Sequence, residues 1–108
     1  MPLLLQQGDI TRIAVDAVVN AANTELKRGG GVCGAIFRVA DDPALQAECD
    51  ALAPIEVGDA VWTKAYGLPA KYIIHTVGPI WQGGGSGEED LLYRSYSRAL
   101  LLAGELGI

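Results

Sequence analysis

The sequence has few cysteines and no surplus of positive charge. Its two cysteines, Cys33 and Cys49, show no CxxC spacing and no neighbouring histidine pair, so they indicate neither a zinc site nor a disulfide framework. We expect two reduced thiols and no bound metal. Eight Lys and Arg residues against thirteen Asp and Glu give a net charge of −5 without any basic cluster, which argues against direct nucleic-acid binding through phosphate neutralisation.

Long apolar runs are also missing. No stretch approaches the roughly 20 apolar residues of a membrane span, and the short apolar start lacks the basic residues of a signal peptide. We therefore expect a soluble, cytoplasmic protein without a membrane partner.

The composition fits one small folded domain. Half of the 108 residues are hydrophobic and 19% are charged, close to the average for globular proteins and sufficient for a single core. Short apolar runs predict strands at 3–7, 17–22, 60–63 and 72–77, and helical spacing predicts helices at 32–40, at 43–52 and after residue 87. This order predicts an α/β fold with helices covering a sheet.

The last predicted helix carries two local signals. Ser86 followed by Glu89 fits a capping box at its start. Its spacing predicts one buried stripe, made by Leu92, Tyr96, Ala99, Leu100, Ala103 and Leu106.

Two glycine-rich loops precede helices and are candidate anion sites. The loop at 82–87 is followed by Glu88, Glu89 and Asp90, which would repel a phosphate. The loop at 29–31 has no acidic residue in the following helical turn, so free backbone N–H groups there can face an anion. The alternatives are a surface turn that needs positive φ, or a dinucleotide fingerprint made by Gly29, Gly31 and Gly34, which lacks the expected preceding strand and later acidic residue.

Four motifs together resemble the macro domain family, in family order: GDIT at 8–11, VVNAAN at 18–23, GGGVCGAI at 29–36 and YIIHTVGP at 72–79. The sequence is most similar to the MacroD-type branch, which includes ADP-ribosyl hydrolases and O-acetyl-ADP-ribose deacetylases. The resemblance implies a three-layer α/β/α fold with a mixed central sheet, ADP-ribose as ligand and no cofactor. The family pattern continues past Ile108 into a further strand and a second phosphate loop. We therefore expect residues 1–108 to be the N-terminal portion of one incomplete macro domain, to bind ADP-ribose weakly or not at all by itself, and to self-associate through its incomplete sheet.

The resemblance also implies roles for individual residues. Asp9 would accept a hydrogen bond from the adenine amino group, and the backbone of Ile10 would read the neighbouring ring nitrogen. Asn23 would bind the distal ribose, while Asn20 would brace the loop. The diphosphate and distal ribose would be wrapped by Gly30, Gly31, Val32 and Cys33. From the residues alone, Asp9 is better explained as a turn or helix-cap residue, and either asparagine can be a loop cap.

Asn23 and Cys33 are the candidate catalytic residues. The hydrolase branch commonly has Asp where this chain has Cys33, and a carboxylate can accept a proton from water in a way that a neutral thiol cannot. The expected function is hydrolysis of ADP-ribosyl esters, either on mono-ADP-ribosylated acidic side chains or in O-acetyl-ADP-ribose. The alternatives are a non-catalytic reader of ADP-ribose or of an ADP-ribosylated protein, and a chain active only after assembly. Phe37, where the branch often has His, and His75, the only histidine, are expected to be packing residues.

Overall fold

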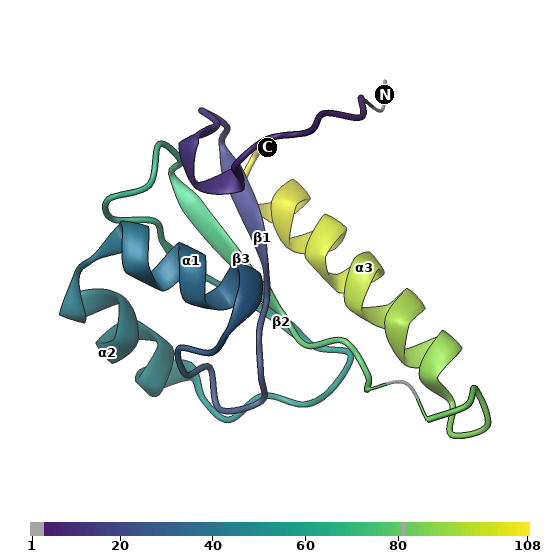
Figure 1. Ribbon diagram of the computed structural model, residues 1–108. Helices are drawn as coiled ribbons and strands as arrows, with labels where there is room; N and C mark the ends of the chain where they lie inside the picture. The colour runs from purple at the N-terminus through teal and green to yellow at the C-terminus, as the bar shows by residue number, and fades with distance from the viewer. Residues whose placement is uncertain (1–3, 81) are drawn as a thin grey trace.

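The computed structural model describes residues 4–80 and 82–108. Within these residues the chain forms three strands, three α-helices and one short 3-10 helix, and Figure 1 shows their arrangement. Along the chain these are η1 (Ile10–Arg12), β1 (Ala17–Ala21), α1 (Gly31–Ala40), α2 (Pro43–Leu52), β2 (Ala60–Lys64), β3 (Tyr72–Thr76) and α3 (Glu88–Glu105).

The three strands form one mixed sheet in the order β1-β3-β2. The central strand β3 pairs in parallel with β1, where Asn20 lies opposite His75, and antiparallel with β2, where Val61 lies opposite the same histidine. The parallel pair places the carboxyl ends of β1 and β3 at the same edge of the sheet. The expected mixed sheet is confirmed.

Helices cover both faces of this sheet, so the fold has three layers (Figure 1). Side chains alternate along each strand. Val18 and Ile73 join the core beneath α1 and α2, whereas Ala17 and Ile74 pack with Ala99 of α3 on the opposite face. The three-layer α/β/α architecture is thereby confirmed.

The boundaries of α1 and α2 follow local sequence signals. Asp41 ends α1 in the left-handed conformation, with φ of 43°, and Asp42 then caps α2 by accepting a hydrogen bond from the N–H of Ala44. Pro43 occupies the first turn of α2, where its missing N–H has no helical partner to lose.

The strand expected at 3–7 is wrong for its described part. Residues 4–7 form no strand, and the side chains of Leu4 and Leu5 are 84% and 97% exposed, while residue 3 lies outside the described residues. A strand forms only where a neighbouring strand supplies backbone partners. Within the described residues, all three strands of the sheet lie elsewhere in the chain.

One expectation for α3 is wrong and a second is only partly right. Its N-cap is Gly87, without a side-chain capping bond, so Ser86 and Glu89 form no capping box. The buried residues of the helix include Ser95 and Ala99, while Tyr96 and Leu100 are 64% and 72% exposed. Helical spacing gives the width of an apolar stripe, but the position of the sheet decides which part of the stripe is buried.

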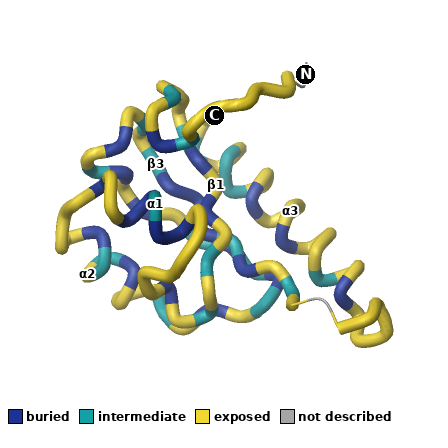
Figure 2. The backbone as a smooth tube through the Cα atoms, in the orientation of Figure 1, coloured by how far each residue is buried: buried dark blue, intermediate teal, exposed yellow. Residues whose placement is uncertain are grey.

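An uncovered apolar surface results from this placement of α3. The helix packs on β3 and β2 and leaves its flank at Leu92, Tyr96 and Leu100 exposed, as is Val19 on β1. Figure 2 shows the exposed side of α3 in yellow beside its buried stripe. One edge of β1 is paired with β3 and its other edge is without a strand partner among residues 4–80 and 82–108.

In the part of the chain that the structure describes, no helix has both the length and the hydrophobicity needed to cross a bilayer.

The only histidine lies fully buried in the centre of the sheet. His75 Nδ1 is 3.0 Å from Asn20 Nδ2, and Nε2 is 2.9 Å from Thr63 Oγ1. Desolvation lowers the pKa of His75 from 6.5 to about 4, so the ring is neutral at physiological pH. The expected packing role, with satisfied ring nitrogens, is confirmed.

This burial predicts that stability falls on mild acidification. The unfolded chain takes up a proton on His75 below pH 6.5, whereas the folded chain does so only near pH 4. The free energy of unfolding should therefore drop between pH 6.5 and 4, by about 2 kcal/mol at pH 5. Urea unfolding at pH 7, 6 and 5 measures the change. A His75→Phe variant should lack the pH dependence between 7 and 5, and a retained slope in that variant would assign it to another group.

Candidate functional site

The glycine loop before α1 is open at the helix N-terminus. Gly30 is the N-cap and makes no side-chain capping bond, and the first helical turn contains no acidic residue. The first intrahelical bond runs from the N–H of Gly34 to the oxygen of Gly30, at 3.1 Å. The N–H groups of residues 31–33 therefore precede the hydrogen-bonded part of the helix and are oriented for an anion.

Glycine is required here for two different reasons. Gly31 has a φ of +55°, which side chains disfavour. A Cβ at Gly34 would lie 2.5 Å from the oxygen of Gly29, so the loop can fold onto the helix only without it. At Gly30 and Gly31, by contrast, an added Cβ would meet no atom within 4 Å. The space directly beside these two glycines is thus free of described protein atoms.

Asn23 closes the other side of this loop. Its Oδ1 accepts a hydrogen bond from the N–H of Lys27 at 3.0 Å, and its Nδ2 donates to the oxygen of Lys27 at 2.8 Å. The expected loop-capping geometry is therefore present. An amide has two donor hydrogens and two acceptor lone pairs, so this exposed side chain keeps one of each for a ligand.

Cys33 contacts the same backbone oxygen of Lys27 that Asn23 binds. Its Sγ lies 3.7 Å from the oxygen of Lys27 and 3.6 Å from Asn20 Nδ2, and the side chain is only 6% exposed. A Cβ at Gly29 would lie 3.8 Å from Asn23 Nδ2 and 4.0 Å from Cys33 Sγ. The structure thus brings Asn23, Cys33 and the glycine loop into one group around Lys27.

The positive charges near this loop are already paired or exposed. Lys27 Nζ forms a 2.8 Å ion pair with Asp50 on α2, and the hydrogen bond with Asp50 raises the pKa of Lys27 above its usual value. An anion at the loop would therefore rely mainly on the backbone N–H groups of α1.

Asp9 and Ile10 lie on η1, which contacts α1. Asp9 caps this short helix, with Oδ1 accepting from the N–H of Thr11 at 3.0 Å and from its hydroxyl at 2.6 Å. The Thr11 hydroxyl hydrogen bond is the main cause that lowers the pKa of Asp9. Asp9 is therefore an ionised cap whose Oδ2 faces only Arg12, at 3.7 Å.

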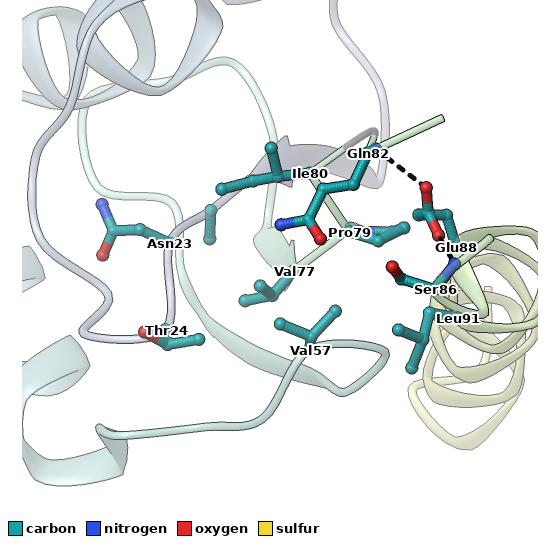
Figure 3. A pocket seen from close by; sticks show the side chains of 12 residues that line it. Asn23, Thr24, Val57, Val77, Pro79, Ile80, Gln82, Ser86, Glu88 and Leu91 are labelled. Carbon is teal, nitrogen blue, oxygen red and sulfur yellow. Dashed lines mark hydrogen bonds between the residues drawn. The ribbon is translucent and has the colours of Figure 1, made fainter. Parts of the chain in front are cut away.

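A cavity of about 450 Å³ lies where β1 and β3 end, lined in part by Asn23 and Thr24 after β1 and by Val77 to Ile80 after β3. Figure 3 shows Asn23 at one side of this cavity, with Gln82, Ser86 and Glu88 at the other. Of the predicted site residues, only Asn23 lines it. The sequence analysis missed the other lining residues, although carboxyl ends of parallel strands are common ligand sites and Gly78-Pro79 marks such an end.

The second glycine loop binds the protein's own carboxylate. Glu88 is buried, and its oxygens accept hydrogen bonds from the N–H groups of Gln82, Gly84 and Ser86 at 2.6 to 2.8 Å. These bonds, that of Gln82 first, lower the pKa of Glu88. The loop is thus unsuited to a phosphate, as expected, although the occupant is Glu88 rather than a Ser86 cap.

A metal centre is not indicated by residues 4–80 and 82–108, which contain no group of three or more His, Cys, Asp or Glu side chains placed to hold an ion. Both cysteines are free thiols, and burial raises the pKa of Cys49 to about 11.

Comparisons with known proteins agree with this architecture. The family model described as Macro domain matches residues 19–108. A macro domain-containing protein of Mesorhizobium japonicum is 58% identical over 99 residues, covering 92% of this chain and 56% of that protein. A Pantoea vagans protein named O-acetyl-ADP-ribose deacetylase 1 is 49% identical over 106 residues, covering 94% of this chain and 61% of its own length.

Solved structures match equally well. The Oceanobacillus iheyensis macrodomain with ADP superimposes with a TM-score of 0.86 at 38% identity, covering 94% of this chain and 56% of that one. The chain thus spans little more than half the length of the relatives that it matches. The family model, the sequence relatives and the shared fold together show that this chain belongs to the macro domain family.

Proposed function

We propose that the protein binds ADP-ribose with its diphosphate at the N-terminus of α1. The observation that carries this proposal is the open, uncapped helix start at Gly30 and Gly31, which adjoins an asparagine with hydrogen-bonding capacity to spare. The N–H groups of Gly31, Val32 and Cys33 bind phosphate oxygens, and Asn23 binds hydroxyls of the distal ribose. Part of the substrate beyond that ribose enters the cavity that Asn23 lines.

The adenine end is assigned to η1. Asp9 is ionised and keeps Oδ2 free of a close partner other than Arg12, so it can accept a hydrogen bond from an exocyclic amino group, while the backbone of Ile10 reads the neighbouring ring nitrogen. Guanine carries a carbonyl oxygen at that position and would be rejected.

Related structures support the placement of the ligand at Asn23 and the glycine loop. The Oceanobacillus iheyensis macrodomain was solved with ADP, and a variant with a glycine replaced was solved with ADPR. In three variants of that protein the replaced residues, an asparagine, a glycine and an aspartate, are spaced by seven and three positions. Asn23, Gly30 and Cys33 have the same spacing here.

We infer that the reaction is hydrolysis of an ADP-ribosyl ester, carried by a mono-ADP-ribosylated acidic side chain or by O-acetyl-ADP-ribose. The name of the Pantoea vagans relative supports this class of reaction. Asn23 orients the ribose, and the glycine loop holds the diphosphate so that a water beside Cys33 is in place. The second candidate is a reader of ADP-ribosylated proteins. It is favoured by Cys33, because a thiol is a poor substitute for a carboxylate as a proton acceptor.

A substitution at the helix start tests the binding site. Gly30→Asp places a carboxylate at the N-cap, where it caps α1 and stabilises the fold slightly, but it occupies the N–H groups that would bind phosphate, as Glu88 does in the second loop. We expect the melting temperature to rise or stay constant and the affinity for ADP-ribose, measured by calorimetry, to fall at least about tenfold. The control is Gly85→Asp in the second loop, where an added Cβ is equally unobstructed. Equal affinities for Gly30→Asp and the parent chain would refute the site.

A second substitution separates the enzyme from the reader. Cys33→Asp supplies a proton acceptor and should raise the rate of ADP-ribose release from an ADP-ribosylated glutamate peptide by about 10², as followed by chromatography. Cys33→Asn has the same shape without the basicity and should stay at the parent rate. If Cys33→Asp still binds ADP-ribose but releases none, the reader is the correct assignment.

We propose further that copies of this chain associate through the outer edge of β1, and that the assembly is more active than the single chain. The support is the edge of β1 without a strand partner in the described residues, beside the exposed Val19 and the apolar flank of α3. Such edges favour pairing with another strand.

Sedimentation velocity tests this association. The parent chain should show a concentration-dependent shift to a dimer, and Val19→Lys should remove it, because a charge on an edge strand opposes pairing. Val39→Lys, at a similarly exposed valine on α1 (38% against 45% exposed), should leave the dimer intact. A monomer at all concentrations for the parent chain would contradict the proposal.

A further inference from the structure

A continuous row of polar groups runs through the core to the candidate site. It begins at Thr63 on β2, crosses His75 on β3 and Asn20 on β1, and ends at Cys33 in the first turn of α1. Asn20, Thr63 and His75 are fully buried, in positions where apolar side chains would normally pack. The row thus connects all three strands of the sheet to α1.

The direction of each hydrogen bond in this row is determined by its chemistry. Asn20 Nδ2 can only donate, so His75 Nδ1 accepts at 3.0 Å and the ring proton lies on Nε2. That N–H donates to Thr63 Oγ1 at 2.9 Å, and the Thr63 hydroxyl donates in turn to the oxygen of Lys64 at 3.1 Å. If the Asn20 amide were turned over, its oxygen would face His75 and its two N–H groups would be buried without a partner. In the observed orientation only one oxygen lacks a partner among the described residues.

Asn20 is held in this orientation at an energetic disadvantage. Its Oδ1 is buried and has no hydrogen-bond partner among the described residues, and an unsatisfied buried acceptor is unfavourable. An apolar side chain at this position would carry no such unsatisfied acceptor. The amide is therefore explained by what its N–H groups contact, His75 on one side and the Cys33 sulfur on the other.

The far end of the row leads to Asn23. Cys33 Sγ, 3.6 Å from Asn20 Nδ2, lies 3.7 Å from the oxygen of Lys27. The N–H and oxygen of the same Lys27 are both bound by the Asn23 side chain. The core is thus connected to an exposed candidate ligand-binding side chain through one buried thiol and one peptide group.

We propose that Asn20, oriented by His75, is a positioning residue that acts through Cys33 and Lys27 to hold the Asn23 side chain in place before any ligand binds. Its importance for ligand binding rests on the proposed function, but the positioning itself does not. Holding a polar binding group in its bound orientation removes an entropic cost from association. The network would therefore affect the ribose end of the ligand and leave the adenine end at Asp9 unaffected.

The first test requires no ligand. Because the chain has a single histidine, a long-range ¹H–¹⁵N spectrum reports His75 without assignment ambiguity. We expect a neutral ring protonated on Nε2 from pH 5 to 8. A ring protonated on Nδ1 would reverse the orientation of Asn20 and overturn the proposal.

The second test measures the loop itself by amide hydrogen exchange. Asn20→Leu, and separately Cys33→Ala, should raise the exchange rate of the Lys27 N–H about fivefold relative to Ile73→Val. Ile73 is a fully buried neighbour on β3, and this variant controls for a general loss of stability. Cys33→Ala removes only the link through the sulfur, keeps the hydrogen bonds among Thr63, His75 and Asn20, and serves if Asn20→Leu does not fold. Unchanged Lys27 exchange in the folded variants would overturn the proposal.

A third measurement separates this proposal from the proposed function. In calorimetry, Asn20→Leu should weaken ADP-ribose binding while leaving adenosine binding unchanged, whereas a merely structural role would weaken both. Absence of ADP-ribose binding by the parent chain would count against the proposed function alone, because the exchange and tautomer results would still decide the positioning role.

Discussion

The parallel pairing of β1 with β3 is the constraint on which the candidate site depends. It sets Asn20 opposite His75, and it continues for one further hydrogen bond, from the N–H of Ala22 to the oxygen of Thr76 at 2.9 Å. Because both strands then end at one edge, the segments that follow them diverge and leave a cavity between them. The crossover returns through α1, whose N-terminus begins beside the same edge. The cavity at this place, beside which we propose that the ligand binds, is therefore a consequence of topology before any side chain is considered.

The two glycine loops show how one structural device serves opposite purposes. In the loop before α3, backbone N–H groups converge on an anion, and that anion is Glu88 of the chain itself. In the loop before α1, the corresponding groups face open space, with neither an acidic residue nor a capping side chain. The two loops differ because acidic residues follow the glycines of the loop before α3 and none follows those of the loop before α1. Where the carboxylate is present it accepts the hydrogen bonds of the loop, and where it is absent the N–H groups stay open to an external anion.

Packing is distributed unevenly over the sheet. The face beneath α1 and α2 carries the larger core, which includes Leu26, Ile36, Leu45 and Ile73, each no more than 1% exposed. On the other face, Ala60, Ile74 and Ala99 make a small cluster, and α3 packs mainly on β2 and β3. The larger core thus lies on the side that carries the glycine loop, and the apolar surface left open is on the opposite side.

Local sequence alone determined the elements whose signals are complete within a few residues. The glycines and the acid-free turn at 29–33, the Asp42-Pro43 start of α2 and the β-branched run of β3 needed no information from elsewhere in the chain, and the order of the motifs indicated the family.

Tertiary structure alone decided which apolar residues are buried. Residues 4–7 have the composition of a strand but pair with no strand of the sheet, and Leu100 has helical spacing but is 72% exposed. It also decided which polar groups meet, because the convergence of Asn23 and Cys33 on Lys27, and of three N–H groups on Glu88, depends on how the backbone turns in space. Propensity and periodicity act over one or two turns of chain, whereas burial and hydrogen bonding depend on partners supplied by distant segments.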